Sequence, residues 1–118
     1  MKAWLAAALL LVGLSAWAQE GWVPKTAAEL VLLDKVRAQP SKVEVKVGAS
    51  ATFGTLTINL RSCLVRPPDQ AADSAAFLVI TDSRGKGEDV FKGWILANTP
   101  SVSQMEHPLY DLRLVACH

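Results

Sequence analysis

Strict alternation of apolar and polar residues is the feature that most constrains the fold of this chain. In KVEVKVG, residues 42–48, three valines share one parity while lysine and glutamate take the other. In TFGTLTINLRSCLVRPP, residues 52–68, the same parity is shared by Leu56, Ile58 and Leu60. A period of two is that of a half-buried β-strand, because successive side chains point to opposite faces of a sheet. Both segments therefore predict strands with one buried face.

Three further segments carry strand signals. AAFLVI (residues 75–80) is a short apolar run of the kind buried on both sides, VFKGWILA (90–97) follows a glycine-containing turn, and LYDLRLVAC (109–117) comes last. Residues 26–38 stay open between helix and strand, since a threonine and a glutamate match a capping box while Leu30, Leu32 and Val36 share a strand parity. We favour a strand there. Short strands between turn signals predict an all-β fold, a small β-sandwich or barrel-like domain with one disulfide.

The first twenty residues have the organisation of a secretory signal peptide. Lys2 precedes an unbroken apolar run, and Ala16, Trp17 and Ala18 give the small-x-small pattern of a cleavage site. The run is shorter than the roughly 20 apolar residues of a membrane span, although an uncleaved anchor stays open. We therefore expect three parts: a signal peptide (1–18), an N-terminal tether (19–29) and a single β domain (30–118).

Net charge and cellular location restrict the classes of partner that this protein can bind. Cleavage removes 18 of the 118 residues and one of the 12 basic residues, so equal numbers of basic and acidic residues remain. A chain without an excess of basic residues has few unpaired cations to bind the phosphates of a nucleic-acid backbone, so we expect no nucleic-acid partner. We also expect no stable membrane span after signal cleavage. Export predicts a periplasmic or secreted protein.

Cys63 and Cys117 are the two cysteines of the chain. In an oxidising compartment such a pair is normally a disulfide, and closing a loop of about 55 residues contributes roughly 4 kcal/mol. Regular alternation places both cysteines on the polar parity of their strands, which predicts a disulfide outside the leucine core. The alternative is a β-bulge near each cysteine, which would reverse its facing.

The segment before the last strand gathers reactive residue types. Glu106, His107, Tyr110 and Asp111 are candidates for an acid–base cluster. Tyr110 and Asp111 face apart in a strand, however, and neither a nucleophile nor a cofactor motif accompanies the set. A metal site joining His107 to Cys117 would have to bend the extended strand between them. We expect no catalytic, metal or cofactor-binding residue and keep the four as candidate partner contacts.

Trp94, in FKGWI, is a fifth candidate contact. Large aromatic residues in strands mostly serve burial, so we favour core packing of this ring over an exposed binding role.

The order of these motifs resembles an exported bacterial family, domain of unknown function 2155. The similar features are FGxL, a cysteine, AF-x-x-I, F-x-GW, a small-residue-Pro turn, HP-x-YD and a final cysteine, found here within residues 30–117. Arg113 departs from the aromatic residue that the family usually carries after Tyr-Asp. The resemblance implies a periplasmic or secreted domain with paired cysteines, and it supplies no reaction, ligand or catalytic residue.

The sequence thus predicts an exported envelope domain that is a non-catalytic binding or structural module, with an envelope protein or a cell-wall component as its partner. The alternative is a small envelope hydrolase or metal-dependent enzyme that uses residues 106–111. A solvent-accessible pocket joining His107 to a polar group of another strand would favour the enzyme. A packed His107 would favour the binding module.

Overall fold

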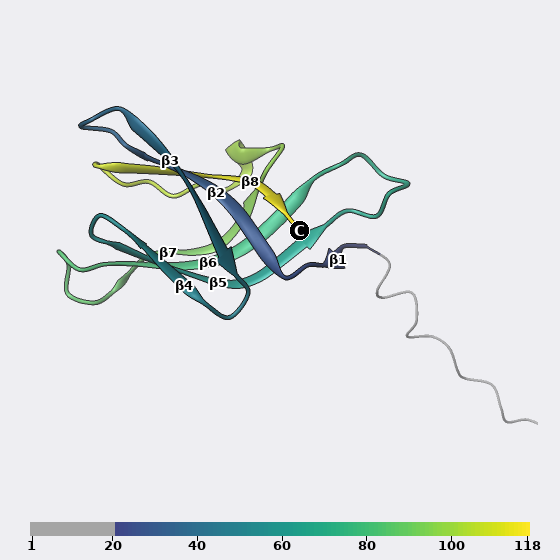
Figure 1. Ribbon diagram of the computed structural model, residues 1–118, viewed down its shortest axis with the longest axis horizontal. Coiled ribbons are helices and arrows are strands. Elements are labelled where there is room, and N and C mark those ends of the chain that lie inside the picture. Colours follow the sequence, from purple (N-terminus) through teal and green to yellow (C-terminus); the bar gives the residue numbers. More distant parts are fainter. Residues whose placement is uncertain (1–20) are drawn as a thin grey trace, which may run out of the picture.

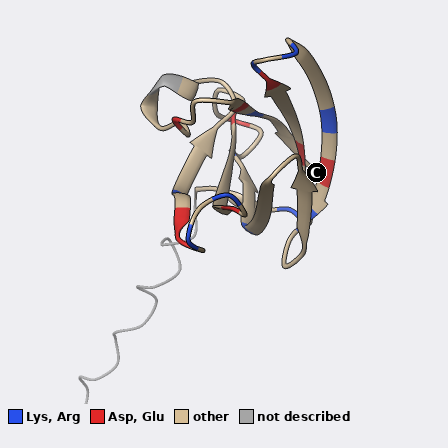
Figure 2. Ribbon diagram, turned by 90° about the vertical axis from the view of Figure 1, so that its left-hand side faces the viewer, with Lys and Arg blue, Asp and Glu red and all other residues tan. Residues whose placement is uncertain are grey.

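The computed structural model describes residues 21–118, which form two antiparallel β-sheets (Figure 1). One sheet has the order β1-β5-β6-β7, with β4 also pairing with β5, and the other has the order β3-β2-β8. Figure 2 shows the strands in two layers. The elements in chain order are β1 (Val23–Pro24), β2 (Ala27–Asp34), β3 (Gln39–Lys46), β4 (Ser50–Phe53), β5 (Leu56–Val65), β6 (Ser74–Asp82), β7 (Asp89–Leu96), the 3-10 helix η2 (Pro100–Val102) and β8 (Tyr110–Cys117).

β2 settles the segment that was open between helix and strand. It is the central strand of its sheet and pairs with β3 on one side and β8 on the other. Its alternate residues Ala28, Leu30 and Leu32 are fully buried. Pairing on both edges satisfies the backbone more completely than one capping box could, so the strand parity prevails over the helix signal.

The expected tether is shorter than predicted, because strands begin inside residues 19–29. Val23 and Pro24 form β1 against the end of β5, and β2 begins at Ala27. The carbonyl of His118 accepts the N–H groups of Thr26 and Ala27 at 3.1 and 2.9 Å. Long-range pairing with the other end of the chain therefore orders a stretch that has no periodicity of its own. The expected signal peptide, residues 1–18, lies outside the described residues.

The core lies between the two sheets, where the predicted apolar parities meet. Leu56, Ile58 and Leu60 of β5 are fully buried, as predicted, and face Leu112 and Leu114 of β8 within one cluster. Burying a side chain of this kind stabilises the fold by about 1.5–3 kcal/mol relative to leaving it exposed. β6, expected to be buried on both sides, has seven buried positions among its nine. The all-β, two-sheet fold class is confirmed.

Cys63 and Cys117 form a disulfide that joins the two sheets, with their Cα atoms 5.6 Å apart. The placement predicted from regular alternation is wrong, because both cysteines belong to the core cluster. Arg61 in β5 and Val115 in β8 have no partner in their ladders, where the register shifts. Each adds one residue to its strand and turns the cysteine two positions later to the core face. The bulge alternative is the one observed.

Prolines lie where the sheets tolerate them. Pro67 and Pro68 follow the end of β5, whereas Pro40 lies inside β3 opposite Leu33. β3 is an edge strand of its sheet, and an edge strand accommodates a residue without an N–H group. Among residues 21–118, no helix is long and apolar enough to cross a membrane.

Candidate functional site

The structure divides the predicted acid–base cluster between the inside and the outside of the sandwich. His107 and Tyr110 are buried, and their ring centroids lie 5.1 Å apart. Glu106 is exposed, and Asp111 is half-buried. The two carboxylates line an open groove together with Lys35 and the segment before β8, which includes the otherwise buried His107. Of the four candidates, only His107 and Tyr110 therefore come together in the interior.

His107 is held by two hydrogen bonds inside the fold. Its Nε2 lies 2.8 Å from Oδ2 of Asp82, and its Nδ1 accepts the N–H of Leu109 at 3.0 Å. Because the backbone N–H can only donate, Nδ1 is the acceptor and Nε2 carries the proton that is donated to the carboxylate. Both ring nitrogens thus form hydrogen bonds within the protein, and neither is left for a ligand.

Asp82 is the buried partner that sequence reasoning missed. Its pKa is lowered from 3.8 to about 2, chiefly by the hydrogen bond that Oδ1 accepts from the N–H of Arg84 and next by the bond from His107. Burial opposes these effects without reversing them. The carboxylate is therefore ionised in the folded protein at neutral pH.

Tyr110 lies beside the His107 ring and completes a buried polar cluster of Asp82, His107 and Tyr110, which we call the polar corner. Its ring packs edge-on against Phe53, at 5.8 Å between centroids, and its hydroxyl accepts the N–H of Thr55 at 3.4 Å. Gly54, between those two residues, has φ +59, and a Cβ there would collide with the Tyr110 hydroxyl. The turn between β4 and β5 can approach the phenol so closely because this position has no side chain.

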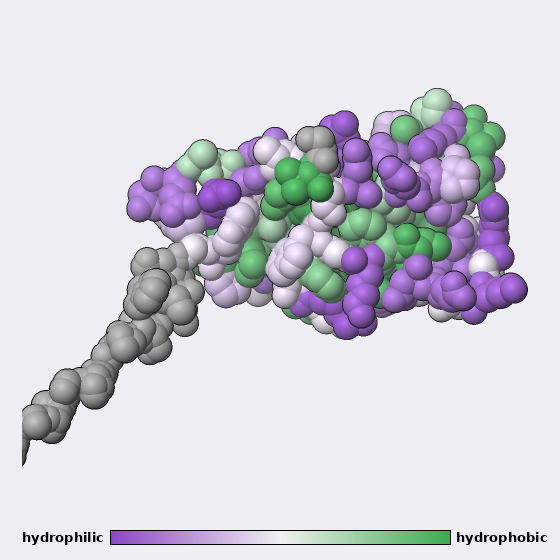
Figure 3. All heavy atoms as spheres, turned by 180° about the vertical axis from the view of Figure 1, so that it is seen from behind, coloured by the Kyte–Doolittle hydropathy of each residue, from purple (hydrophilic) through white to green (hydrophobic). Residues whose placement is uncertain are grey.

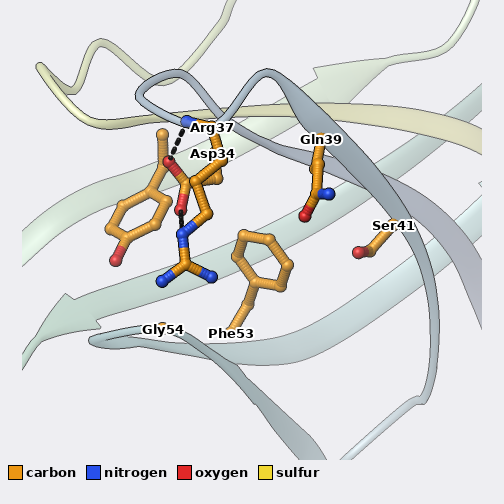
Figure 4. Close-up of a pocket in the computed structure, with 7 residues that line it drawn as sticks. Asp34, Arg37, Gln39, Ser41, Phe53 and Gly54 are labelled. Carbon is orange, nitrogen blue, oxygen red and sulfur yellow. Dashed lines mark hydrogen bonds and ion pairs between the residues drawn. The ribbon is translucent and has the colours of Figure 1, made fainter.

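A recess of about 230 Å³ lies beside the Tyr110 ring, at the turn between β2 and β3 (Figure 4). Its charged groups satisfy one another: Asp34 Oδ1 accepts the N–H groups of Val36 and Arg37, and Oδ2 lies 4.0 Å from the Arg37 Nε. Figure 4 shows the Arg37 side chain extending across the recess toward Gly54. This recess is organised by its own turn, and its geometry points to no ligand.

The described part of the chain, residues 21–118, contains no group of three or more His, Cys, Asp or Glu side chains that could hold a metal ion. Cys63 and Cys117 are joined to each other. His118 lies 3.6 Å from Glu44, with both side chains more than half exposed.

Trp94 is not a core residue, so the predicted packing role is wrong. It is 41% exposed on the outer face of the five-stranded sheet, with its ring edge-on to Phe77 at 5.2 Å. The neighbouring Ile95 is 1% exposed and takes the core position of β7. Because successive side chains of a strand face opposite ways, burial of Ile95 directs Trp94 outward.

An apolar recess of about 240 Å³ lies beside Trp94 on this outer face; we call it the tryptophan recess. It is lined by apolar or aromatic residues: Trp22, Leu64, Ala75, Trp94 and Leu96. Leu64 pairs with Ala75, and Ala75 with Leu96, so these three form one row across β5, β6 and β7. Apolar and near-neutral side chains gather in the middle of the face seen from behind in Figure 3. A small alanine between two leucines leaves the hollow.

The fold and these surfaces define a class: a small all-β domain of two sheets joined by one core disulfide, with an apolar recess between two tryptophans. The family model described as "Uncharacterized protein conserved in bacteria (DUF2155)" matches residues 28–117, and the chain belongs to this family. The predicted resemblance is confirmed.

One curated relative is the "Uncharacterized protein RP359" of Rickettsia prowazekii (strain Madrid E), with 26% identity over 94 residues. The match covers 78% of this chain and 61% of that relative, so the chain spans less than two thirds of the relative's length. No solved structure matches the chain.

Proposed function

We propose that this protein is an exported domain of the bacterial envelope, periplasmic or secreted, that binds or supports another envelope component and performs no chemistry of its own. The observation that carries the proposal is the closure of the polar corner. Both nitrogens of His107 and both oxygens of Asp82 are hydrogen-bonded within the protein. A general base needs a nitrogen within reach of a substrate proton, and His107 offers none.

Export is supported by the signal-like composition of residues 1–18 and by the disulfide. Disulfides persist in oxidising compartments and are rare in the reducing cytosol. A disulfide that joins two sheets through the core suits a domain that folds after export. Its contribution to the free energy of unfolding matters most in a small domain, because a small core by itself provides little stability.

The hydrolase alternative has less support. The groove at residues 106–111 joins His107 to Lys35, Glu106 and Asp111, and its other lining residues carry no hydroxyl or thiol group: Gln104, Met105 and Pro108. Nζ of Lys35 donates to the carbonyl of His107 at 2.8 Å, so this ammonium is already engaged. The groove thus lacks a hydroxyl or thiol nucleophile, and the imidazole of His107 that lines it is hydrogen-bonded to Asp82.

Cell fractionation and crosslinking test the proposal. We expect the protein in the envelope or medium fraction with residue 19 at its amino terminus, and we expect crosslinking in intact cells to capture a discrete partner. A variant lacking residues 2–18 serves as the control and should stay in the cytosol. Met1 or Lys2 at the amino terminus of the exported protein contradicts cleavage, and failure to capture any partner contradicts the binding function.

A second experiment separates binding from catalysis. The enzyme alternative predicts that a His107→Asn variant that still folds loses all cellular function. We expect such a variant, once its disulfide and circular dichroism spectrum match those of the wild type, to capture the same partner. Loss of function with partner capture intact would favour the enzyme.

A further inference from the structure

The lining of the tryptophan recess restricts the chemistry of its occupant. Its five lining residues carry no charged side chain and no hydroxyl, carboxamide or carboxylate group. A sugar ring buried there would leave most of its hydroxyls without partners, and burying a polar group without a hydrogen bond is unfavourable. An apolar group meets no such cost and removes the two indole faces from water.

The size of the recess restricts the occupant further. Its volume of about 240 Å³ is below the roughly 300–1,000 Å³ of pockets that enclose drug-sized ligands. It matches instead the room that one large side chain needs. Protein interfaces commonly concentrate their binding energy in such a place, where a single aromatic or aliphatic anchor enters a well-packed hollow.

Two cations flank the recess along the strand direction, since Arg66 bonds to the backbone of Asp73, before Ala75, and Lys92 pairs with Val79, after it. The guanidinium of Arg66 lies 4.6 Å from the centre of the Trp22 ring. Lys92 lies two residues before Trp94, so both side chains project from the same face of β7. Within residues 21–118, no carboxylate forms an ion pair with Arg66 or Lys92.

The carboxylate of Asp73, near Arg66, is already hydrogen-bonded to three other residues. Its Oδ1 accepts the N–H groups of Ser74 and Asn98, both at 2.8 Å, and its Oδ2 accepts the Thr99 hydroxyl at 3.4 Å. These bonds tie the loop before β6 to the residues that follow β7. The rim of the recess therefore presents positive charge that the described carboxylates leave unpaired, which complements acidic groups on a partner.

We infer that the tryptophan recess is the docking site for a partner protein, which inserts one large apolar side chain between Trp22 and Trp94 and places carboxylates on either side of it against Arg66 and Lys92. The inference rests on the proposed binding function and names its surface and the chemistry of its partner. Tryptophan and arginine are residue types enriched at protein interfaces, in agreement with this assignment.

The experiment uses the exported protein and two synthetic peptides. One peptide has a central phenylalanine flanked by glutamates, and the other has lysines in place of the glutamates. The chain contains four tryptophans, and cleavage after Ala18 leaves Trp22 and Trp94, so selectively excited tryptophan fluorescence then reports on the recess alone. We expect the acidic peptide to bind saturably with a change in this fluorescence, and at least about tenfold more tightly than the basic peptide by calorimetry.

Matched variants locate the binding surface. Trp94→Ala is expected to weaken acidic-peptide binding by about tenfold or more, as loss of an anchor contact does, and Trp94→Phe to retain most of it. Lys92→Glu is expected to weaken it by a similar factor and to relax the preference against the basic peptide. Lys86→Glu, in the exposed turn before β7, is the charge-matched control and should bind as the wild type does. Melting temperatures identify any variant that fails to fold.

Several results would overturn the inference: no saturable binding of the acidic peptide, equal affinity for both peptides, or unchanged affinity in folded Trp94→Ala. A dimer that dissociates on Trp94→Ala would instead assign the recess to a second copy of this chain, and binding to neutral phospholipid vesicles would assign it to a lipid surface. If crosslinking in the envelope captures the same partner with Trp94→Ala as with the wild type, the proposed function stands and this inference fails.

Discussion

At the scale of single residues, the polar corner shows how one missing Cβ and one backbone donor organise three side chains. Gly54 lets its turn approach the Tyr110 hydroxyl, and the Leu109 N–H fixes the proton of His107 on the nitrogen that faces Asp82. Only His107 and Tyr110 of the four acid–base candidates belong to this network, and they bond to Asp82 and to the Thr55 backbone. A buried network of this kind contributes to a single well-defined structure because each member depends on the others.

The first prediction concerns Gly54→Ala. The substitution places a Cβ at φ +59 and 2.8 Å from Cζ of Tyr110. The matched control is Gly87→Ala, which has φ +84 but nothing within 4 Å of the added Cβ. Both variants carry backbone strain, and only the first also carries the collision. We expect urea unfolding to show Gly54→Ala to be less stable than the control by about 1–3 kcal/mol. Equal stabilities would contradict this packing.

The second prediction concerns the Asp82 carboxylate and pH. Its folded pKa of about 2 lies below the ordinary value of 3.8, so its contribution to stability is present above pH 3.8 and is lost as the pH falls toward 2. We expect Asp82→Asn to be less stable than the wild type at neutral pH and the difference to shrink across that window. Unfolding at a series of pH values measures it, with Asp69→Asn in an exposed loop as the control. A pH-independent difference would contradict the assignment.

At the scale of strands, two β-bulges decide which way the cysteines face. Leu60 and Leu114 keep the predicted core parity, and the unpaired residues Arg61 and Val115 then reset it. Without these insertions Cys63 would project away from the core, and the disulfide could not bridge the sheets. A bulge in each strand is therefore the condition for the bond.

The third prediction follows from the bulge in β5. Deleting Arg61 restores regular alternation and turns Cys63 to the outer face. We expect the exported deletion variant to contain two free thiols when titrated under denaturing conditions. The substitution Arg61→Ala keeps the extra residue, so it should contain none, like the wild type. A disulfide that still forms in the deletion variant would show that the strand can recover its register in another way.

At the scale of the whole molecule, the disulfide adds a covalent link between two sheets that core packing and hydrogen bonds, such as that from the Cys117 N–H to Oγ of Ser74, also hold together. The cysteines are 54 positions apart, and the carbonyl of His118 holds the start of β2 directly beside the bond. The tryptophan recess lies on the opposite side of the five-stranded sheet from that core, so the same sheet carries stability on one face and the proposed binding surface on the other.

The fourth prediction is the contribution of this bond. Opening it is expected to lower the free energy of unfolding by about 4 kcal/mol, a large share of the roughly 5–15 kcal/mol of a typical domain. Urea unfolding with and without reductant measures the loss. Reductant should not affect the Cys63→Ala/Cys117→Ala double variant, which controls for other effects of the reagent. If the reduced wild type is as stable as the oxidised protein, the bond does not stabilise the fold.

The sequence by itself determined the all-β class, the core parity of β5 up to Leu60 and the family, because the period-two pattern and the order of motifs are local and survive in the linear chain. Only the tertiary structure decided the facing of the cysteines, the exposure of Trp94 and the pairing of His107 with Asp82. A bulge shifts every later residue by one position, and it follows from how two strands meet. Which polar groups neutralise each other likewise depends on residues that the fold alone brings together.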